Sequence, residues 1–175
     1  MTLSGGGEAK ILKVSGDLDH AISEIRRVSH NLMPSELEDL GLEPALRALC
    51  REFKGRSGVA VTVRTVATAA APELALALFR IAQEALSNIG KHSKATIAAV
   101  SLSREGKEIV LSVSDNGVGF KLGAKRALAG RGMGLGNMRE RSESVGGTLE
   151  VHSTPGVGTT LAVRAPLSAA GGIVA

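Results

Sequence analysis

The stretch SVSDNGVGF, residues 112–120, sets a carboxylate at the end of a predicted strand and follows it with two glycines. Asp115 precedes Asn-Gly, and a second glycine stands at position 119. A tight turn explains this pattern if the stretch stands alone, because Asn-Gly is a strong turn signal and Asp caps turns. Whether the carboxylate has a further role depends on the other segments of the chain.

A second set of polar residues lies on a helix predicted from Ala71-Pro72 to about Lys91. Glu84, Asn88 and Lys91 are spaced i, i+4 and i+7, which places them on one helical face. Asn inside a helix is unfavourable, because its side chain competes for backbone hydrogen bonds. It needs open solvent or a functional role, and a solvated face is the usual explanation for a single helix. The opposite side carries Leu78, Ile81, Ala85 and Ile89.

Basic residues gather among glycines later in the chain. Between residues 121 and 141 there is one acid, Glu140, and this excess of positive charge suggests an anionic ligand. The six basic residues of this segment are Lys121, Lys125, Arg126, Arg131, Arg139 and Arg141.

Composition bounds the class of protein. Hydrophobic residues make up 43% of the 175 residues, enough for a core, and the net charge of +4 is mild. Aromatic residues are only 2%, which argues against a nucleic-acid reader that stacks bases. The single cysteine, Cys50, lies in an apolar helical pattern and is predicted to be buried rather than nucleophilic. No apolar run reaches transmembrane length, and the N-terminus is unlike a signal peptide, so we expect a soluble chain.

The N-terminal part is predicted to be helical. Residues 1–8 read as a flexible leader, and a long helix follows over 9–34, ended by Pro34. Its apolar residues alternate in steps of three and four, which favours packing on a second helix. A further helix opens at Leu42-Glu43-Pro44-Ala45, with proline in its first turn. The seam of the long helix consists of Ile11, Val14, Leu18, Ala21, Ile25, Val28 and Leu32, and the stripe of the second of Leu42, Leu46, Leu49 and Phe53.

The remaining segments indicate the fold class. Strands are predicted over 59–67, 95–103 and 107–114, and a hairpin is predicted from TLEVHS, TPGVG and TTLAVRAP. A glycine-rich basic loop covers 116–132, a helix covers about 133–145, and residues 168–175 form a frayed tail. We predict an α/β two-layer sandwich over 35–167, a mixed β-sheet covered on one face by helices and preceded by one long helix.

Four motifs occur in a fixed order: helix E-x-x-x-N, strand-D-x-G-x-G, G-x-G-L-x-N-M-R-E-R, and G-x-G-T. Each is weak alone, but together they resemble the ATP-binding domain of the GHKL superfamily of gyrase-type ATPases, histidine kinases and MutL. RIAQEALSNIGKHSKAT and GMGLGNMRERSESVGG are similar to sensor histidine kinases whose response regulators carry helix-turn-helix domains. AISEIRRVSHNLMPSELEDLGLEPAL resembles their second dimerisation helix and its link, so the resemblance covers roughly residues 11–167.

The resemblance implies an ATP site with Mg²⁺. Asp115 would accept a hydrogen bond from the adenine amino group, while Gly117 and Gly119 let the backbone approach the ring. Asn88 matches the magnesium ligand, and Glu84 would orient a metal-bound water or polarise the attacking group. The residue that reaches the phosphates would be Lys91 or His92, with a solvated helix end as the alternative for His92.

Further matches lie in the last two motifs. Gly132, Gly134, Leu135 and Gly136 match a lid in which backbone N–H groups hold phosphates near a helix N-terminus. Thr159 matches a threonine that completes the adenine pocket through water, although a threonine in the middle of a hairpin is also ordinary β-sheet filler.

The activity implied is transfer of the γ-phosphoryl group of Mg-ATP to a histidine on a helical bundle, by positioning and electrostatics. The acceptor motif of the subfamily, Glu-Leu-His-Asp followed soon by Gln, is absent from this sequence. His20 and His30 lie on the N-terminal helix. His30 occupies an outer heptad position before Asn rather than before an acidic base, so we expect the chain to lack its acceptor.

The implied partners are a histidine-bearing dimerisation helix of the parent kinase and a downstream response regulator, without direct contact to nucleic acid. The parent would be a homodimer, and this chain a monomer or weak dimer. The expected location is cytoplasmic, either free or as the cytoplasmic part of a membrane-bound sensor. Three alternatives remain: a GHKL serine kinase acting on a regulatory protein, a non-catalytic ATP-binding module, and an ATP hydrolase with Glu84 as base.

Overall fold

The computed structural model describes residues 34–121 and 133–167. The chain divides into two compact units, Met1–Pro34 and Ser35–Ala175, and the described residues belong almost entirely to the second unit. The predicted leader, nearly all of the predicted long helix, residues 122–132 and the tail 168–175 lie outside the described residues.

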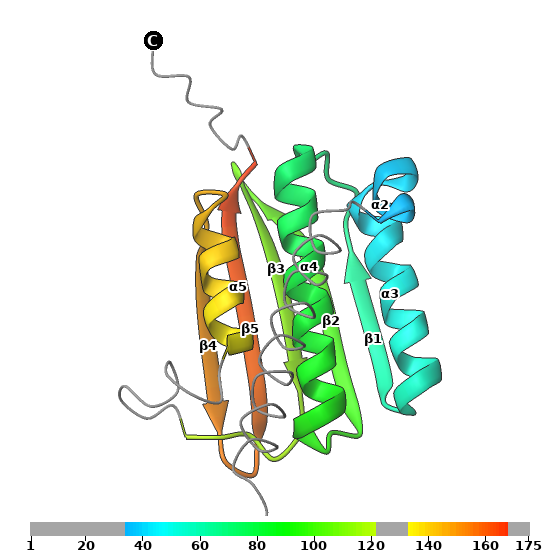
Figure 1. Cartoon of the computed structure of the whole chain (residues 1–175), viewed down its shortest axis with the longest axis vertical. Helices are drawn as coiled ribbons and strands as arrows, with labels where there is room; N and C mark the ends of the chain where they lie inside the picture. Colours follow the sequence, from blue (N-terminus) through cyan, green and yellow to red (C-terminus); the bar gives the residue numbers. More distant parts are fainter. Residues whose placement is uncertain (1–33, 122–132, 168–175) are drawn as a thin grey trace, which may run out of the picture. The chain divides into compact units, whose positions relative to one another are not determined.

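The second unit contains a five-stranded mixed sheet in the order β1-β2-β3-β5-β4 (Figure 1). Strands β1 and β2 are parallel, and the other neighbouring pairs are antiparallel. The prediction of a mixed sheet is confirmed. The strands are β1 (Ala60–Thr65), β2 (Ile97–Glu105), β3 (Glu108–Asp115), β4 (Thr148–Thr154) and β5 (Gly158–Pro166).

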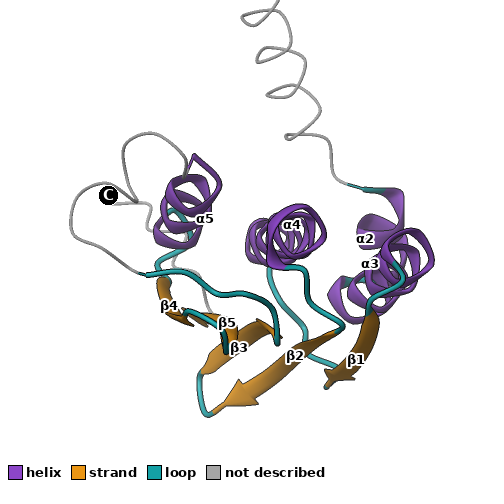
Figure 2. Cartoon of the chain, turned by 90° about the horizontal axis from the view of Figure 1, so that it is seen from below, coloured by secondary structure: helices purple, strands orange, loops and turns teal. Residues whose placement is uncertain are grey.

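Helices cover one face of this sheet, as Figure 2 shows for α3, α4 and α5. The strands explain why, because alternate residues of the central strands are buried apolar side chains. Val100, Val113 and Leu161, for example, belong to neighbouring strands and are each at most 4% exposed. The helices are α2 (Ser35–Leu40), α3 (Leu42–Ser57), α4 (Pro72–Asn88), the π-helix η1 (Ile89–Ser93) and α5 (Met133–Glu143).

The helices α3 and α4 follow the predicted patterns. All members of the predicted α3 stripe are buried, and α3 ends at Gly58 in the left-handed conformation. Helix α4 has Pro72 at its start, and Leu74, Leu78 and Ile81 are fully buried against the sheet side. Cys50 on α3 is also buried, as predicted. The core therefore lies between the sheet and these two helices, and α4 packs against β3.

Two local features differ from the prediction. The short helix α2 follows Pro34 directly, where no helix was expected. The helix α4 does not run regularly to Lys91 but widens into the π-helix η1 after Asn88. A π turn adds one residue to the turn and rotates everything that follows. Lys91 therefore leaves the face of Glu84 and Asn88 and lines a groove beside α3 with Phe53 and Arg56.

Candidate functional site

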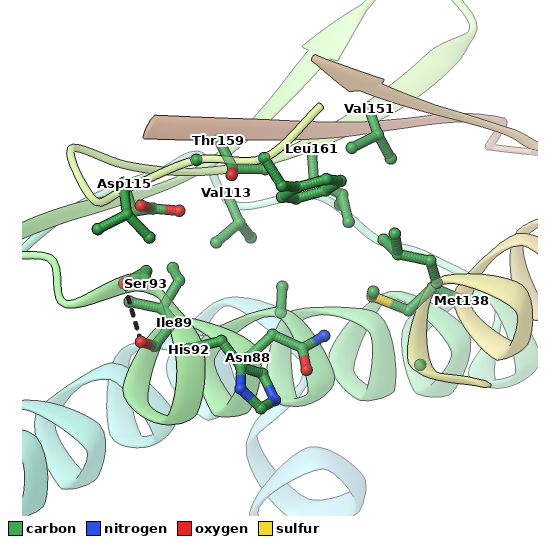
Figure 3. A pocket seen from close by; sticks show the side chains of 16 residues that line it. Asn88, Ile89, His92, Ser93, Val113, Asp115, Met138, Val151, Thr159 and Leu161 are labelled. Carbon is green, nitrogen blue, oxygen red and sulfur yellow. Dashed lines mark hydrogen bonds between the residues drawn. The ribbon is translucent and has the colours of Figure 1, made fainter. Parts of the chain in front are cut away.

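A pocket of about 340 Å³ opens between the sheet and the helices α4 and α5. Figure 3 shows Asp115 and Thr159 on the sheet side, facing Asn88 and His92 on the helix side. Its volume lies within the range of small-molecule sites in proteins. The lining residues are Ala85, Asn88, Ile89, His92, Ser93, Val113, Asp115, Val118, Gly119, Phe120, Gly134, Leu135, Met138, Val151, Thr159 and Leu161.

Most of this lining is apolar. Val113 and Leu161 come from the central strands, Ile89 comes from η1, and Met138 comes from α5. An apolar pocket between a sheet and a helix, here called the slot, suits a planar ring, whose faces need no hydrogen bonds. The polar groups lie at the edges of the slot and would fix the orientation of a ligand.

The carboxylate of Asp115 stands at one edge of the slot. Its Oδ1 atom accepts a hydrogen bond of 2.7 Å from the Gly117 N–H, which closes the turn that the sequence predicts. Among the residues that the structure describes, Gly117 is the one donor to this carboxylate. Asp115 therefore caps the turn with one oxygen and keeps acceptor capacity for a ligand with the other. Thr159 lies directly opposite Asp115 on β5 and lines the same pocket.

The two glycines after Asp115 are required by close backbone contacts. A Cβ on Gly117 would lie 2.2 Å from the backbone oxygen of Ser93. Gly119 has a φ of +55°, and its Cβ would lie 2.1 Å from the Thr154 oxygen. The Val118 N–H donates to the Ser93 oxygen at 2.7 Å, so residues 115–119 are fixed between η1 and the β4–β5 hairpin. Backbone approach thus explains both glycines without any ligand.

Asn116 has a structural role in the same turn. Its Oδ1 atom accepts hydrogen bonds from the Thr96 and Ile97 N–H groups at 3.0 and 2.9 Å, and its amide donates to Thr96 Oγ1 at 3.0 Å. These bonds hold the end of β3 to the start of β2. The position of the Asp115 carboxylate therefore depends on the side chain that follows it.

Glu84, Asn88 and Gly134 come together where α4 meets the start of α5. A Cβ on Gly134 would lie 2.4 Å from Glu84 Oε1 and 3.3 Å from Asn88 Nδ2, so both side chains converge on this glycine. Both are half-buried, and neither forms a side-chain hydrogen bond with another residue of the described segments. Within the described segments, an amide at the pocket edge and a carboxylate just behind it therefore have oxygen atoms without a hydrogen-bond partner, and they lie together as expected for residues one helical turn apart.

The structure separates the predicted residues into three groups. Asn88, His92, Asp115, Gly119, Gly134, Leu135 and Thr159 line the pocket. Gly117 and Glu84 stand behind this lining, in contact with Ser93 and Gly134 respectively. Lys91 lines the other groove, Gly136 has open space around its Cβ position, and Gly132 lies outside the described residues. Of the alternatives Lys91 and His92, the structure thus brings His92 to the pocket.

Several lining residues were not predicted. Ser93 is 9% exposed, and its hydroxyl donates to the Ile89 oxygen at 2.8 Å within η1. Phe120 and Val118 are apolar side chains of a loop and are 37% and 47% exposed. The sequence could have indicated these two residues, because large apolar side chains are unusual in a polar loop. Val113, Leu161 and Met138 gave no signal, because apolar pocket walls and a core have the same sequence pattern.

Cys50 and Arg80 are among the ionisable groups outside the pocket whose pKa values are shifted. Burial raises the pKa of the Cys50 thiol to about 11, so the thiol stays protonated and is a poor nucleophile. Burial, and then the nearby charge of Arg141, lower the pKa of Arg80. Arg80 also donates to Gln83 at 2.7 Å.

Neither a metal cluster nor a membrane span is found in the described segments. Within 34–121 and 133–167, no three His, Cys, Asp or Glu side chains are grouped to hold a metal ion. Over the same residues, no helix has the length and hydropathy needed to cross a bilayer.

Comparison with known proteins gives relatives among sensor kinases. The chain is 43% identical over 155 residues to the sensor histidine kinase MctS of Rhizobium johnstonii, covering 87% of this chain and 33% of MctS. It is 35% identical over 158 residues to the oxygen sensor histidine kinase NreB of Staphylococcus carnosus, covering 89% and 45%. The chain thus spans less than half the length of these curated relatives.

Solved structures share the fold. The histidine kinase domain of the Erythrobacter litoralis blue-light activated kinase EL346 matches with a TM-score of 0.62 at 21% identity, over 70% of this chain and 59% of that one. The Acinetobacter baumannii histidine kinase AdeS matches with a TM-score of 0.61 at 13% identity, over 96% and 87%. At these identities the likeness shows the arrangement of helices and strands.

A family match covers the segment that builds the pocket. Residues 73–169, more than half of the chain, match the family described as histidine kinase-, DNA gyrase B- and HSP90-like ATPases. This segment contains α4, η1, the strands β2 to β5 and α5, so it supplies every lining residue of the pocket. The chain belongs to the family of histidine kinase-, DNA gyrase B- and HSP90-like ATPases, whose ATP-binding domain it contains.

Proposed function

We propose that this chain is the catalytic part of a sensor histidine kinase, which binds Mg-ATP in the pocket and transfers the γ-phosphoryl group to a histidine of a dimerisation helix. One observation carries the proposal. The apolar slot has a carboxylate and a hydroxyl, Asp115 and Thr159, at one edge and the amide of Asn88 at another, with the Glu84 carboxylate just behind the lining beside Gly134. The names of the relatives support the reaction class.

Adenine fits the first edge of the slot. The free acceptor capacity of Asp115 would take the 6-amino N–H, and a charged acceptor forms a stronger bond than a neutral one. Val113 and Leu161 would cover one face of the ring and Ile89 the other. Because Gly117 and Asn116 hold the carboxylate in place before a ligand enters, little ordering is needed on binding.

The second edge fits a magnesium ion bound mainly to phosphates. Mg²⁺ prefers oxygen ligands and usually takes one or two from the protein, with phosphates and waters completing its shell. Asn88 would supply its amide oxygen, and the Glu84 carboxylate, one turn away, would hold a water of the same shell. When bound, the ion would neutralise charge on the phosphates and help orient them for transfer.

The chain's own groups would do the remaining work. Glu84 would polarise the attacking group, since its carboxylate is half-buried and uncommitted among the described residues. His92 on η1 would reach the phosphates from the helix side, and the backbone N–H groups at Gly134 and Leu135 would face them from the N-terminus of α5. The apolar slot would exclude water from the faces of the adenine ring.

The acceptor histidine would come from elsewhere. His30 and His20 lie outside the described residues, and His30 is followed by Asn rather than by an acid that could act as base. We therefore propose phosphorylation in trans of a histidine-bearing dimerisation helix, followed by transfer to a response regulator.

Radiolabelled ATP tests this function. The chain alone should bind Mg-ATP and remain unlabelled, whereas a separate fragment bearing the histidine-containing helix of a sensor kinase should acquire a phosphate that is stable to base and labile to acid. Acid-labile labelling of the chain alone that disappears in His30→Gln would make His30 the acceptor. Phosphoserine on a partner would indicate a serine kinase, and steady phosphate release without an acceptor would indicate an ATP hydrolase using Glu84.

A further inference from the structure

Three polar side chains form a row across β3, β5 and β4 on the helix-covered face of the sheet. The strand register pairs Asp115 with Thr159 and pairs Thr159 with Ser153. Asp115 and Thr159 line the pocket, whereas Ser153 lies one strand further out and is not part of the lining. The Ser153 hydroxyl can therefore influence a ligand only through the lining residues that it contacts, Thr159 and Phe120.

The Ser153 hydroxyl has three contacts. It accepts the Phe120 N–H at 2.9 Å, it donates to the Gly158 oxygen at 3.2 Å, and it lies 2.9 Å from Thr159 Oγ1. A serine hydroxyl has one proton and two acceptor positions. All three contacts are hydrogen bonds together in only one arrangement, in which Phe120 and Thr159 donate and Gly158 accepts. The count of donors and acceptors thus makes Thr159 the donor and Ser153 the acceptor of the hydrogen bond between them.

We propose that Ser153 is a positioning residue that sets the base specificity of this site, an inference that rests on the proposed function. Because the Thr159 hydroxyl donates its hydrogen bond to Ser153, only the lone pairs of Thr159 Oγ1 face the pocket. Together with the Asp115 carboxylate, the row then offers two acceptors to the two N–H groups of a purine 6-amino group, with Thr159 in direct contact rather than through the water that the resemblance implies. A 6-oxo purine brings a carbonyl oxygen to the same place, where its lone pairs meet those of Thr159.

The Ser153→Ala variant separates this role from a structural one. Without Ser153, the Thr159 hydroxyl rotates freely and can donate to a 6-oxo group, so the preference for ATP over inosine triphosphate should fall about tenfold. The variant also removes the partner of the Phe120 N–H and should weaken nucleotide binding generally. That second loss should affect both nucleotides alike, because Phe120 offers only an apolar side chain, which does not distinguish a 6-amino from a 6-oxo group. The ratio of the two affinities isolates the effect on the base.

Matched variants control for the loss of a side chain. Ser153→Thr keeps the hydroxyl and should keep the parent ratio. Thr160→Ala removes an exposed threonine from the opposite face of β5 and should also keep it. In a Thr159→Val background, Ser153→Ala should leave the ratio unchanged, because the group through which Ser153 acts is gone.

Calorimetric titration of the whole chain with ATP and with inosine triphosphate, in magnesium, gives both affinities. A lowered ratio in Ser153→Ala that Ser153→Thr restores supports the proposal. An unchanged ratio in a folded Ser153→Ala protein overturns it and leaves ATP binding intact. If the alanine variant does not fold, Ser153→Cys carries the same expectation, since a thiol is only a weak acceptor. Failure of the parent chain to bind either nucleotide would contradict the proposed function instead.

Discussion

Asp115 and Thr159 stand directly opposite each other on the antiparallel strands β3 and β5, and both side chains line the same pocket. The pairing brings the carboxylate of the D-x-G-x-G motif beside the threonine hydroxyl of the G-x-G-T motif, although 44 residues separate them in the sequence. The two residues keep this position relative to each other, because the buried side chains of β3 and β5 allow only one register between the strands. The consequences for ligand binding can be tested at each residue.

Replacing Asp115 by Asn should weaken ATP binding without unfolding the chain. The Asn amide oxygen can still accept the Gly117 N–H, so the turn is kept, but the charged acceptor is lost. The expected cost in binding free energy is about 1.5–3 kcal/mol. Calorimetry on the folded variant measures it, with Asp39→Asn on the exposed side of α2 as the matched control. Equal affinities of parent and Asp115→Asn would remove Asp115 from the nucleotide site.

Replacing Asn88 by Ala should abolish the magnesium dependence of ATP binding. Ala is the better helix former, so α4 should fold at least as well. ATP affinity is measured with magnesium and again with a chelator, for the parent and the variant. Asn137→Ala, which removes an exposed amide from α5, is the control. A variant whose affinity still rises with magnesium as in the parent would show Asn88 to be only a surface residue.

Two glycine substitutions should have opposite effects on stability. In Gly117→Ala the new Cβ meets a backbone oxygen at 2.2 Å, which no side-chain movement can relieve. The expected loss in the free energy of unfolding is about 1–3 kcal/mol. In Gly136→Ala the Cβ has open space within α5, and the helix should gain up to about 1 kcal/mol. Urea unfolding measures both changes, and equal stability of the two variants would contradict the turn geometry.

The order of elements and the buried faces of α3, α4 and the strands could be predicted from the sequence. Periodicity carries that information. Leu46 in α3 and Leu78 in α4 each belong to a stripe with helical spacing, and Val100 and Leu102 alternate with Ser101 and Ser103. Asp115, Asn88 and Thr159 were predicted through the resemblance. The structure places all three at one pocket, although their roles toward ATP remain proposals.

The π-helix was not predicted, and it is accompanied by one contact with a distant segment and one hydrogen bond within η1. Gly90 packs so closely on Phe53 that a Cβ would lie 3.2 Å from the ring, and the Ser93 hydroxyl bonds back to the Ile89 oxygen. Local propensity gives no sign of either contact. The same limit explains why Lys91 was placed on the wrong face of the helix, and why the partnership of Ser153 with Thr159 appeared only once β4 and β5 were paired.

A substitution of Glu84 can separate ATP binding from phosphoryl transfer. Glu84→Gln keeps the size and shape of the side chain but removes the charge that would polarise the attacking group. ATP affinity should stay within about twofold, while transfer to the histidine-bearing fragment should fall about 10²-fold or more. Glu73→Gln, an exposed acid in the first turn of the same helix, is the control and should transfer at the parent rate.

Gly134→Ala provides an independent test of the same residue. The new Cβ would lie 2.4 Å from Glu84 Oε1, and the flexible carboxylate should move aside without unfolding the chain. Transfer should therefore fall in Gly134→Ala as well, but should fall no further when Gly134→Ala is added to Glu84→Gln, because the two changes remove one group. Additive losses in the double variant would mean that Gly134 acts on the phosphates directly, and normal transfer by Glu84→Gln would exclude Glu84 from the reaction.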